Sequence, residues 1–118
     1  MFKKIFKREI ENEDSNRIAL TDENQIEEII KSSVHKPVLI FKHSTRCGIS
    51  SMMLKRFDSK ITEISAPYYL LDILKYSPLS NLIQDKFDVI HQSPQVLVIK
   101  NGQVIAHDSH SGVLGVKF

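Results

Sequence analysis

The stretch "VLIFKHSTRCGISSMML" (residues 38–54) decides the fold of this chain. It opens with the nearly continuous apolar run "VLIFKH", which is typical of a strand that is covered on both faces of a sheet. A helix that runs to about Asp58 is predicted next from apolar residues at spacings of four, namely Ile49, Met53 and Phe57. Cys47, the only cysteine in the chain, lies at the junction between this strand and this helix.

The segment upstream of this stretch adds a short strand and a helix. "RIAL" (residues 17–20) fits a short strand. Thr21 is then predicted to cap a helix over residues 22–33, whose acidic first turn suits the positive end of the helix dipole. The buried stripe of this helix is expected to be Ile26, Ile29 and Ile30.

The segment downstream continues the alternation of strands and helices. "PYYLLDI" (residues 67–73) indicates another buried strand. In "YSPLSNLIQDKF" (residues 76–87), Ser77 can cap a helix and Pro78 suits its first helical position. Strands that alternate with helices imply parallel pairing in the sheet.

A β-hairpin follows these elements. "QVLVIK" (residues 95–100) and "QVIAHDS" (residues 103–109) are separated by Asn101-Gly102, and this dipeptide between two apolar runs is a strong hairpin signal. The hairpin adds antiparallel partners to the parallel strands. The sequence therefore predicts the α/β class, with a mixed central sheet flanked by helices.

Length and composition limit the class of protein. A chain of 118 residues, with 42% apolar and 25% charged residues, fits one soluble globular domain. A formal charge of +2 is too small to indicate nucleic acid as a partner, and no apolar run approaches the roughly 20 residues that span a bilayer. The first residues also lack the apolar stretch and cleavage site of a signal peptide, so a cytoplasmic location is expected.

Residues 1–16 form a charged N-terminal extension, and residues 17–118 are predicted to form a single domain. Apolar residues of the extension fall at helical spacing: Phe2, Ile5, Phe6 and Ile10. Such a helix could lie on a membrane surface, dock on the domain or remain frayed. The acidic residues between Glu9 and Asp14 would be repelled by anionic lipid, so no membrane partner is expected.

Cys47 has no partner for a disulfide within the chain, since the chain has one cysteine. Any covalent partner must therefore come from another molecule, and a free thiol suits the reducing cytosol. A thiol attacks as the thiolate, which a helix N-terminus and neighbouring cations stabilise. The positively charged candidates for this role are Lys42, His43 and Arg46.

Two uncharged residues complete the predicted surroundings of the sulfur. The hydroxyl of Ser50, one turn after Cys47, can donate a hydrogen bond to the sulfur anion without forming a disulfide, and Gly48 leaves room for a second molecule. The alternative is that Cys47 merely packs in the core, as most lone cysteines do. Its place at a strand-to-helix junction, where anions bind, favours the functional interpretation.

The histidines do not indicate a metal site. His107 and His110 are three positions apart in a predicted strand, which places them on opposite faces. With one cysteine elsewhere in the chain, a zinc site lacks ligands. His91 carries no signal of a role.

Three stretches together resemble a known family. They are "VLIFKHSTRCGISSMML", "HQSPQVLVIKNGQVI" (residues 91–105) and "HDSHSG" (residues 107–112). In combination they resemble the thioredoxin-like proteins and, more narrowly, the monothiol bacilliredoxins, which are redox proteins of the bacillithiol system. The resemblance runs from about residue 38 to residue 112 and implies a thioredoxin-like fold.

The resemblance also implies roles for individual residues. Thioredoxin-like folds place a proline, preceded by a cis peptide bond, opposite the active-site cysteine, and Pro94 after Ser93 matches that position. Cys47 is accordingly the candidate catalytic residue, and the candidate substrate-binding residues are Thr45, Ser93 and Pro94. An ordinary trans proline at the first residue of a strand is the alternative.

The sequence departs from the family pattern at two places. Many relatives carry proline where this chain has Gly48, which can loosen the site. Thioredoxin-like domains usually close with a helix, whereas "SGVLGVKF" (residues 111–118) shows no helical stripe. The closing helix is therefore expected to be missing, which would leave one sheet face partly exposed unless the N-terminal segment or a second subunit covers it.

The function that the resemblance implies is that of a monothiol thiol-disulfide oxidoreductase. Cys47 would take a small thiol, bacillithiol or a similar molecule, from its mixed disulfide with a client protein. A second small-thiol molecule would then release Cys47. The implied partners are thus a small thiol as co-substrate and S-thiolated client proteins, with no tightly bound cofactor.

Two other functions stay open from the sequence. "CGIS" (residues 47–50) differs by one residue from the CGFS motif of monothiol glutaredoxins, which hold an iron–sulfur cluster between two subunits. However, this chain has "AHDSHSG" (residues 106–112) where glutaredoxins usually have paired glycines. The other alternative is a thioredoxin-fold interaction module whose cysteine is vestigial.

Overall fold

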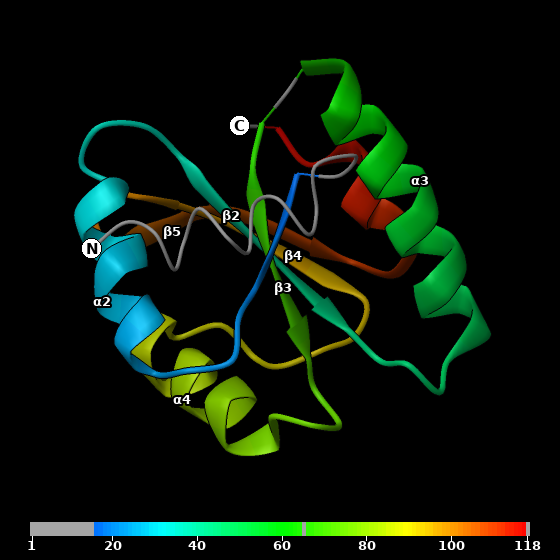
Figure 1. Cartoon of the computed structure of the whole chain (residues 1–118), viewed down its shortest axis with the longest axis horizontal. Coiled ribbons are helices and arrows are strands. Elements are labelled where there is room, and N and C mark those ends of the chain that lie inside the picture. The colour runs from blue at the N-terminus through cyan, green and yellow to red at the C-terminus, as the bar shows by residue number, and fades with distance from the viewer. Residues whose placement is uncertain (1–15, 65, 118) are drawn as a thin grey trace.

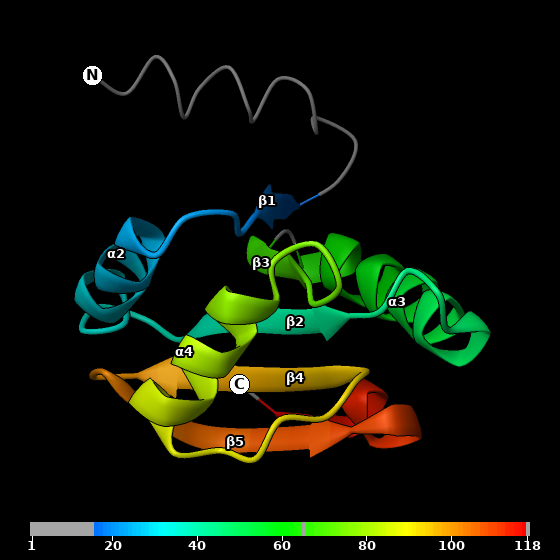
Figure 2. The ribbon, with the colours of Figure 1, turned by 90° about the horizontal axis from the view of Figure 1, so that it is seen from below.

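Five strands form one mixed sheet at the centre of the computed structural model, which describes residues 16–64 and 66–117 (Figure 1). The strands are β1 (Arg17–Ala19), β2 (Val38–His43), β3 (Tyr68–Asp72), β4 (Gln95–Lys100) and β5 (Gln103–Ser109). Figure 2 shows their order across the sheet, β1-β3-β2-β4-β5. β3 pairs in parallel with β1 and β2, whereas β4 pairs antiparallel with β2 and β5. The predicted α/β class and mixed sheet are confirmed.

Helices cover both faces of this sheet (Figure 1). They are α2 (Asn24–Ser32), α3 (Gly48–Ile64), α4 (Ser77–Phe87) and the 3-10 helix η1 (His110–Gly115). One buried cluster joins α2 and α4 to the sheet, and a second joins α3 and η1 to the opposite face. Across the described residues, no helix has the length and apolar character needed to cross a membrane. Nearly all of the predicted charged extension, residues 1–15, lies outside the described residues.

β2 lies in the middle of the sheet, between β3 and β4. Leu39 and Phe41 join the buried cluster beneath α3, whereas Ile40 joins the cluster beneath α2 and α4. These three side chains are at most 2% exposed. Both faces of β2 are therefore covered, as its apolar run predicts, and its carboxyl end leads directly to the loop that carries Cys47.

α3 is longer than predicted, since it ends at Ile64 rather than near Asp58. Its buried positions are Ser50, Met53, Leu54, Phe57 and Ile61. These positions keep helical spacing to the last turns of the helix, which therefore continues to pack on the sheet. Ile49 lies one position off this stripe and is 58% exposed, so of the three apolar residues that indicated the helix only Met53 and Phe57 are buried.

The start of α2 differs from the predicted cap. The helix begins at Asn24, with Glu23 at the N-cap position and no side-chain cap. The side chain of Gln25 holds this turn instead, since its Oε1 accepts the backbone N–H groups of Thr21 (2.8 Å) and Asp22 (3.0 Å). These two N–H groups precede the helix, whereas the N–H of its first residue, Asn24, donates to Asp22 Oδ1 (2.8 Å). The side-chain acceptor at this helix start is therefore Asp22 rather than the predicted Thr21.

The start of α4 also lacks the predicted cap. Ser77 is the first residue of the helix, and Tyr76 occupies the N-cap position without a side-chain hydrogen bond. Pro78 follows Ser77 in the first turn, one position after the first helical position that was predicted for it. A proline there costs no hydrogen bond, because the first N–H groups of a helix have no partner within it.

The predicted hairpin of β4 and β5 is confirmed. Asn101 (φ 53°) and Gly102 (φ 75°) both adopt left-handed backbone angles, which a tight two-residue hairpin turn requires. The turn is also tied to the end of α2: Asn101 N–H donates to Ser33 O, and Gly102 N–H donates to Ser33 Oγ, both at 2.8 Å. A register shift between Val98 and Ile99 marks a bulge in this pair.

Among the described residues, the chain after β5 forms η1 rather than a closing α-helix. Val113 of η1 and Val116 just after it are 1% and 7% exposed and belong to the cluster beneath α3. Lys60 Nζ of α3 also donates to Leu114 O. The short 3-10 helix thereby packs on α3 and covers the part of the sheet face that the missing helix was expected to leave open.

Candidate active site

The loop after β2 places Cys47 at the start of α3. Cys47 N–H donates to Ser44 O (3.2 Å), which closes a tight turn. The carbonyl of Cys47 then accepts the first helical hydrogen bond from Ser51 N–H (3.0 Å), so Cys47 occupies the N-cap position. The residue is partly exposed. Cys47 is therefore not part of the apolar core, which argues against the packing alternative.

The sulfur of Cys47 accepts a backbone hydrogen bond. Ser50 N–H lies 3.4 Å from Cys47 Sγ, in the arrangement by which an N-cap side chain satisfies a free N–H of the first turn. Hydrogen bonds to an ionised acceptor are stronger than those to a neutral one. The positive end of the helix dipole acts in the same direction. Both features stabilise negative charge on the sulfur.

The hydroxyl of Ser50 points into the interior rather than toward the sulfur. Its Oγ accepts Ser44 N–H (3.1 Å) and lies 2.8 Å from His43 Nδ1. We assign the hydroxyl proton to a bond with Nδ1, because in this arrangement Oγ accepts Ser44 N–H while its own proton also has an acceptor. This differs from the predicted donation of the hydroxyl to Cys47, and the backbone N–H makes that contact instead. The reason is that Ser50 occupies a buried position of α3, which turns its side chain toward β2.

His43 acts on the active-site turn through Ser50. Burial lowers the pKa of His43, and the nearby Asp72 only partly opposes this shift. A neutral imidazole is therefore favoured near neutral pH. His43 thus braces the turn through a hydrogen bond, whereas the sequence suggested a positive charge beside Cys47.

Replacing Ser50 with alanine is expected to lower the free energy of unfolding by about 1–3 kcal/mol, because it removes the shared partner of two polar groups. Those groups are Ser44 N–H and His43 Nδ1. Urea unfolding measures the loss. Ser51→Ala, at the exposed position one residue on, is the control and should change stability by less than about 0.5 kcal/mol. Equal effects of the two substitutions would contradict the role of Ser50 as the shared partner of Ser44 N–H and His43 Nδ1.

Three exposed residues flank Cys47 along the chain, namely Thr45, Arg46 and Gly48. Within the part of the chain that the structure describes, Arg46 makes no hydrogen bond or ion pair through its side chain. Its guanidinium group is therefore available to an anionic group on an incoming molecule. Contact of Thr45 and Gly48 with a substrate stays a prediction.

Replacing Gly48 with alanine is expected to raise the free energy of unfolding by about 0.4–1 kcal/mol, because alanine restricts the unfolded chain. Gly48 is the first residue of α3, and a Cβ there would meet no atom within 4 Å. Gly102→Ala is the matched opposite, since its φ of +75° disfavours any side chain. Urea unfolding should thus show a gain for the first variant and a loss for the second. A loss in both would refute the first expectation.

The Ser93–Pro94 peptide bond is cis, as the resemblance predicted. β4 begins directly after it, and the antiparallel register pairs Gln95 with Lys42 of β2. Continuing that register places Pro94 and Ser93 alongside the carboxyl end of β2, from which the chain runs to Cys47. The structure thereby brings two distant segments of the predicted site together.

Lys42 lies on the other face of the sheet from His43. Alternation along β2 places its side chain with Ile40, on the side of α2 and α4. There Lys42 Nζ lies 3.3 Å from His91 Nδ1, and no contact with Cys47 occurs within the described residues. This arrangement differs from the expectation that Lys42 supplies positive charge at the thiolate.

Sequence reasoning missed His91. Its ring connects Lys42 of β2 with Ser80 of α4, which are 49 and 11 positions away from it in the chain. No local spacing or motif indicates such contacts, because the fold alone creates them.

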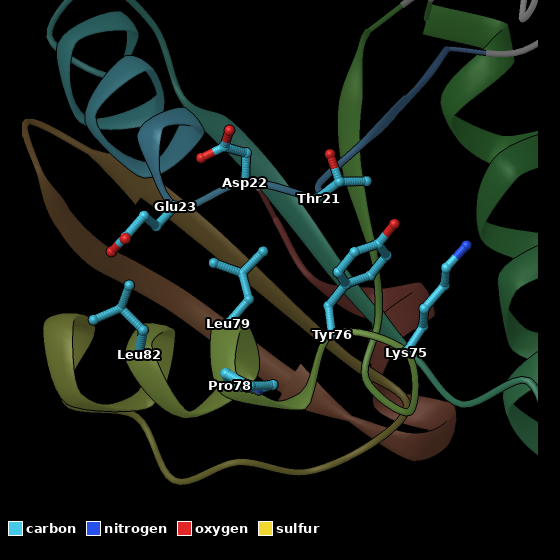
Figure 3. A pocket seen from close by; sticks show the side chains of 8 residues that line it. All are labelled: Thr21, Asp22, Glu23, Lys75, Tyr76, Pro78, Leu79 and Leu82. Atoms are coloured by element: carbon cyan, nitrogen blue, oxygen red, sulfur yellow. The ribbon is translucent and has the colours of Figure 1, made fainter.

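The described residues hold no group of three or more His, Cys, Asp and Glu side chains that could bind a metal ion. A pocket of about 430 Å³ lies between the starts of α2 and α4, beside Tyr76 and Leu79 (Figure 3). None of the predicted site residues lines this pocket. The pocket is thus separate from the cysteine site.

These observations place the chain among thiol redox proteins with a thioredoxin-like fold, because its candidate reactive group is a lone thiol at a helix start and a cis proline lies beside the end of the strand that leads to it. Comparison with known families narrows this class. The chain belongs to the monothiol bacilliredoxin BrxC family, whose model matches residues 18–116.

Solved structures agree with this fold. A candidate oxidoreductase with a thioredoxin fold is 29% identical to this chain, with a TM-score of 0.77, over 84% of this chain and 88% of that one. Thioredoxin from Schistosoma mansoni is 18% identical, with a TM-score of 0.68, over 84% of this chain and 87% of that one. A thioredoxin from Nicotiana alata is 18% identical, with a TM-score of 0.66, over 82% and 83% of the two chains.

Proposed function

We propose that this chain is a monothiol thiol-disulfide oxidoreductase that removes a small thiol, bacillithiol or a similar molecule, from client proteins. The thiolate of Cys47 attacks the small-thiol sulfur of the mixed disulfide. The bond between that sulfur and the client cysteine breaks, and the client leaves as a thiolate that takes up a proton. The small thiol stays on Cys47 through a new disulfide bond.

Release of Cys47 requires a second small-thiol molecule, because the chain offers no other cysteine. The thiolate of this molecule attacks the outer sulfur of the adduct, and the bond to Cys47 breaks. The two small thiols leave as a disulfide, and Cys47 is again a thiolate. The net reaction converts one mixed disulfide and one free small thiol into a reduced client and one small-molecule disulfide. A pool of reduced small thiol is characteristic of the cytosol, where we expect the protein to act.

The observation that carries the proposal is the hydrogen bond from Ser50 N–H to Cys47 Sγ at 3.4 Å. It holds a partly exposed sulfur at the start of a 17-residue helix, where negative charge is favoured. The attacking group of thiol exchange is this anion. Membership of the monothiol bacilliredoxin family supports the same reaction.

The exposed residues around Cys47 suit the two parts of the substrate. Arg46 can make a forked contact with a carboxylate of the small thiol, as guanidinium groups commonly do. Ile49 and Met52, which are 58% and 47% exposed, offer apolar surface to the client protein. The remaining candidate contacts are Thr45, Ser93 and Pro94.

Intact-mass spectrometry of transfer tests the proposal. The purified chain is mixed with a client protein that carries one adduct of bacillithiol, glutathione or coenzyme A. We expect the adduct to appear on Cys47 from the bacillithiol donor and the client to lose the same mass. Absence of transfer from all three donors would refute the proposed reaction.

Further measurements on the purified chain distinguish this reaction from the two other functions that the sequence left open. Absorption between about 300 and 450 nm after anaerobic reconstitution with iron and sulfide, without transfer, would favour an iron–sulfur carrier. An unchanged cellular phenotype in Cys47→Ser would favour an interaction module. Transfer from the glutathione donor alone would support the proposed reaction but identify glutathione, rather than bacillithiol, as its small thiol.

A further inference from the structure

Lys42 is a buried lysine that the reaction at Cys47 does not use. Its exposed fraction is 0%, and it forms no ion pair within the described residues. Burial of an ammonium group without a carboxylate is costly to the folded state. A contribution to stability therefore does not account for a lysine at this position.

Two donors converge on one nitrogen atom of His91. Lys42 Nζ lies 3.3 Å from His91 Nδ1, and Ser80 Oγ lies 3.1 Å from the same atom. A charged ammonium group can only donate, so Nδ1 is the acceptor and the ring proton lies on Nε2. His91 is thus assigned as a neutral imidazole whose single Nδ1 lone pair faces both Lys42 of β2 and Ser80 of α4.

The segment that carries His91 is held at two further points. His91 N–H donates to Gln84 Oε1 (2.5 Å), which ties the segment to α4. Gln95 Nε2 donates to Ile90 O (3.0 Å), which connects the start of β4 to the beginning of the segment. The contact between Lys42 and His91 adds a side-chain link to β2, the strand that leads into the active-site loop.

We propose that Lys42 is a positioning residue for thiol transfer: through its hydrogen bond to His91 it holds residues 91–94 beside the loop that carries Cys47. These residues include the cis Ser93–Pro94 bond. Lys42 touches neither the sulfur nor the client in this arrangement, and it acts through His91. The inference rests on the proposed function, because it assigns how the second segment of that site is held.

The link depends on two protonation states. Burial lowers the pKa of Lys42 to about 8. Burial, together with the charge of Lys42, lowers the pKa of His91. Below the pKa of His91 the protonated ring carries a proton on Nδ1 and no longer accepts from Lys42. Above pH about 8 Lys42 becomes neutral, and a charge-assisted bond is replaced by one of roughly half the strength.

The residues around the contact indicate that its pH dependence comes from Lys42 and His91 themselves. The strand register pairs Lys42 with Leu71 of β3 and Gln95 of β4, and its ammonium group contacts His91. Of these, His91 is the titratable one. The carboxylates on the same elements lie elsewhere: Asp72 accepts Leu74 N–H after β3, and Asp85 is exposed on α4. The link is therefore strongest between the pKa values of His91 and Lys42.

Rates of transfer for Lys42→Met and His91→Phe test the proposal at pH 7. The donor is a client protein with one bacillithiol adduct, and appearance of the adduct on Cys47 is followed by mass. Each variant removes one end of the link and is expected to slow transfer by about tenfold to a hundredfold, since a misplacement of about 1 Å can cost on the order of a hundredfold. The double variant should be no slower than the single variants, because all three break the same link. Additive losses would overturn the proposal.

Further variants separate positioning from ordinary packing. His91→Gln keeps an acceptor on a side chain that does not titrate, so it should recover much of the lost transfer rate. It should also abolish the part of the fall in rate at acidic pH that protonation of His91 causes. His35→Phe, at an exposed histidine, is the matched control and should leave the rate unchanged.

Lys42→Met should be at least as stable as the wild type at pH 7, because a buried charge has been removed. A parallel fall of rate and stability would instead indicate a core role and overturn the proposal.

NMR titration of the His91 imidazole tests the link without thiol chemistry. The pKa of His91 is expected to lie below its ordinary value in the wild type and to rise in Lys42→Met. If the pKa of His91 rises in Lys42→Met but the wild type transfers no thiol, the contact between the two residues stands and the proposed function is refuted. If the wild type transfers the thiol, and Lys42→Met changes neither the rate nor the pKa of His91, the positioning role alone is overturned.

Discussion

Replacing Cys47 with serine is expected to slow thiol transfer on the order of a thousandfold or more, as the loss of a catalytic nucleophile commonly does. A serine hydroxyl stays protonated at neutral pH and cannot form the S–S bond that takes the small thiol from the client. Folding should change little, because serine is also a good N-cap and can accept the Ser50 N–H. Transfer followed by intact mass and unfolding followed in urea separate these two effects.

A matched variant keeps a thiol but moves it away from the N-cap. Cys47→Ser combined with Ser59→Cys places the cysteine at an exposed position of the same helix, about three turns further on. Backbone N–H groups at that position already bond within the helix, and the dipole field falls off beyond the first turn. We expect this variant to exchange no faster than a small free thiol. Transfer at the wild-type rate would show that the N-cap environment contributes nothing.

Replacing Phe57 with alanine is expected to lower the free energy of unfolding by about 3–5 kcal/mol, the usual loss for a buried aromatic side chain. Phe57 is 1% exposed, and its ring centroid lies 5.2 Å from that of Phe41 and 5.1 Å from that of Tyr68. The ring thus joins α3 to both β2 and β3, and it meets Tyr68 edge-on, a favourable aromatic arrangement. Its removal leaves a cavity beneath the helix that begins next to Cys47.

Urea unfolding followed by circular dichroism measures this loss. Domains of this size are stable by about 5–15 kcal/mol in total, so the midpoint should fall sharply. Phe57→Leu keeps part of the apolar volume and should cost less. Met52→Ala on the outer side of the same helix, at a position that is 47% exposed, should change stability by less than about 0.5 kcal/mol. Equal losses at the two positions would contradict the packing described for Phe57.

Local patterns in the sequence predicted most of the fold. The apolar run of β2 indicated a strand covered on both faces, and β2 is the central strand. Asn101-Gly102 indicated a hairpin because both residues tolerate positive φ, and both adopt it. The cis bond before Pro94 had a different basis, since only about 5–6% of X–Pro bonds in folded proteins are cis. That prediction came from the family resemblance rather than from local physics.

Helix boundaries were less accessible to sequence reasoning. Thr21 and Ser77 have the chemistry of N-caps, yet neither caps a helix. At α2, Asp22 Oδ1 rather than Thr21 accepts the N–H of the first helical residue, Asn24. α3 extends past its predicted end because Ile61 still meets a covered face of the sheet. Such competition among acceptors and surfaces depends on neighbours that a short window of sequence does not contain.

By itself the sequence determined that one thiol stands where a central strand passes into a helix, because periodicity and turn chemistry act over a few residues. Only the tertiary structure decided how that thiol is surrounded. Alternation along β2 sends His43 toward Ser50 on one face and Lys42 toward His91 on the other, although the two residues are adjacent in the chain. The physical reason is that the burial of both faces of β2 selects these partners, one of which lies 49 positions away.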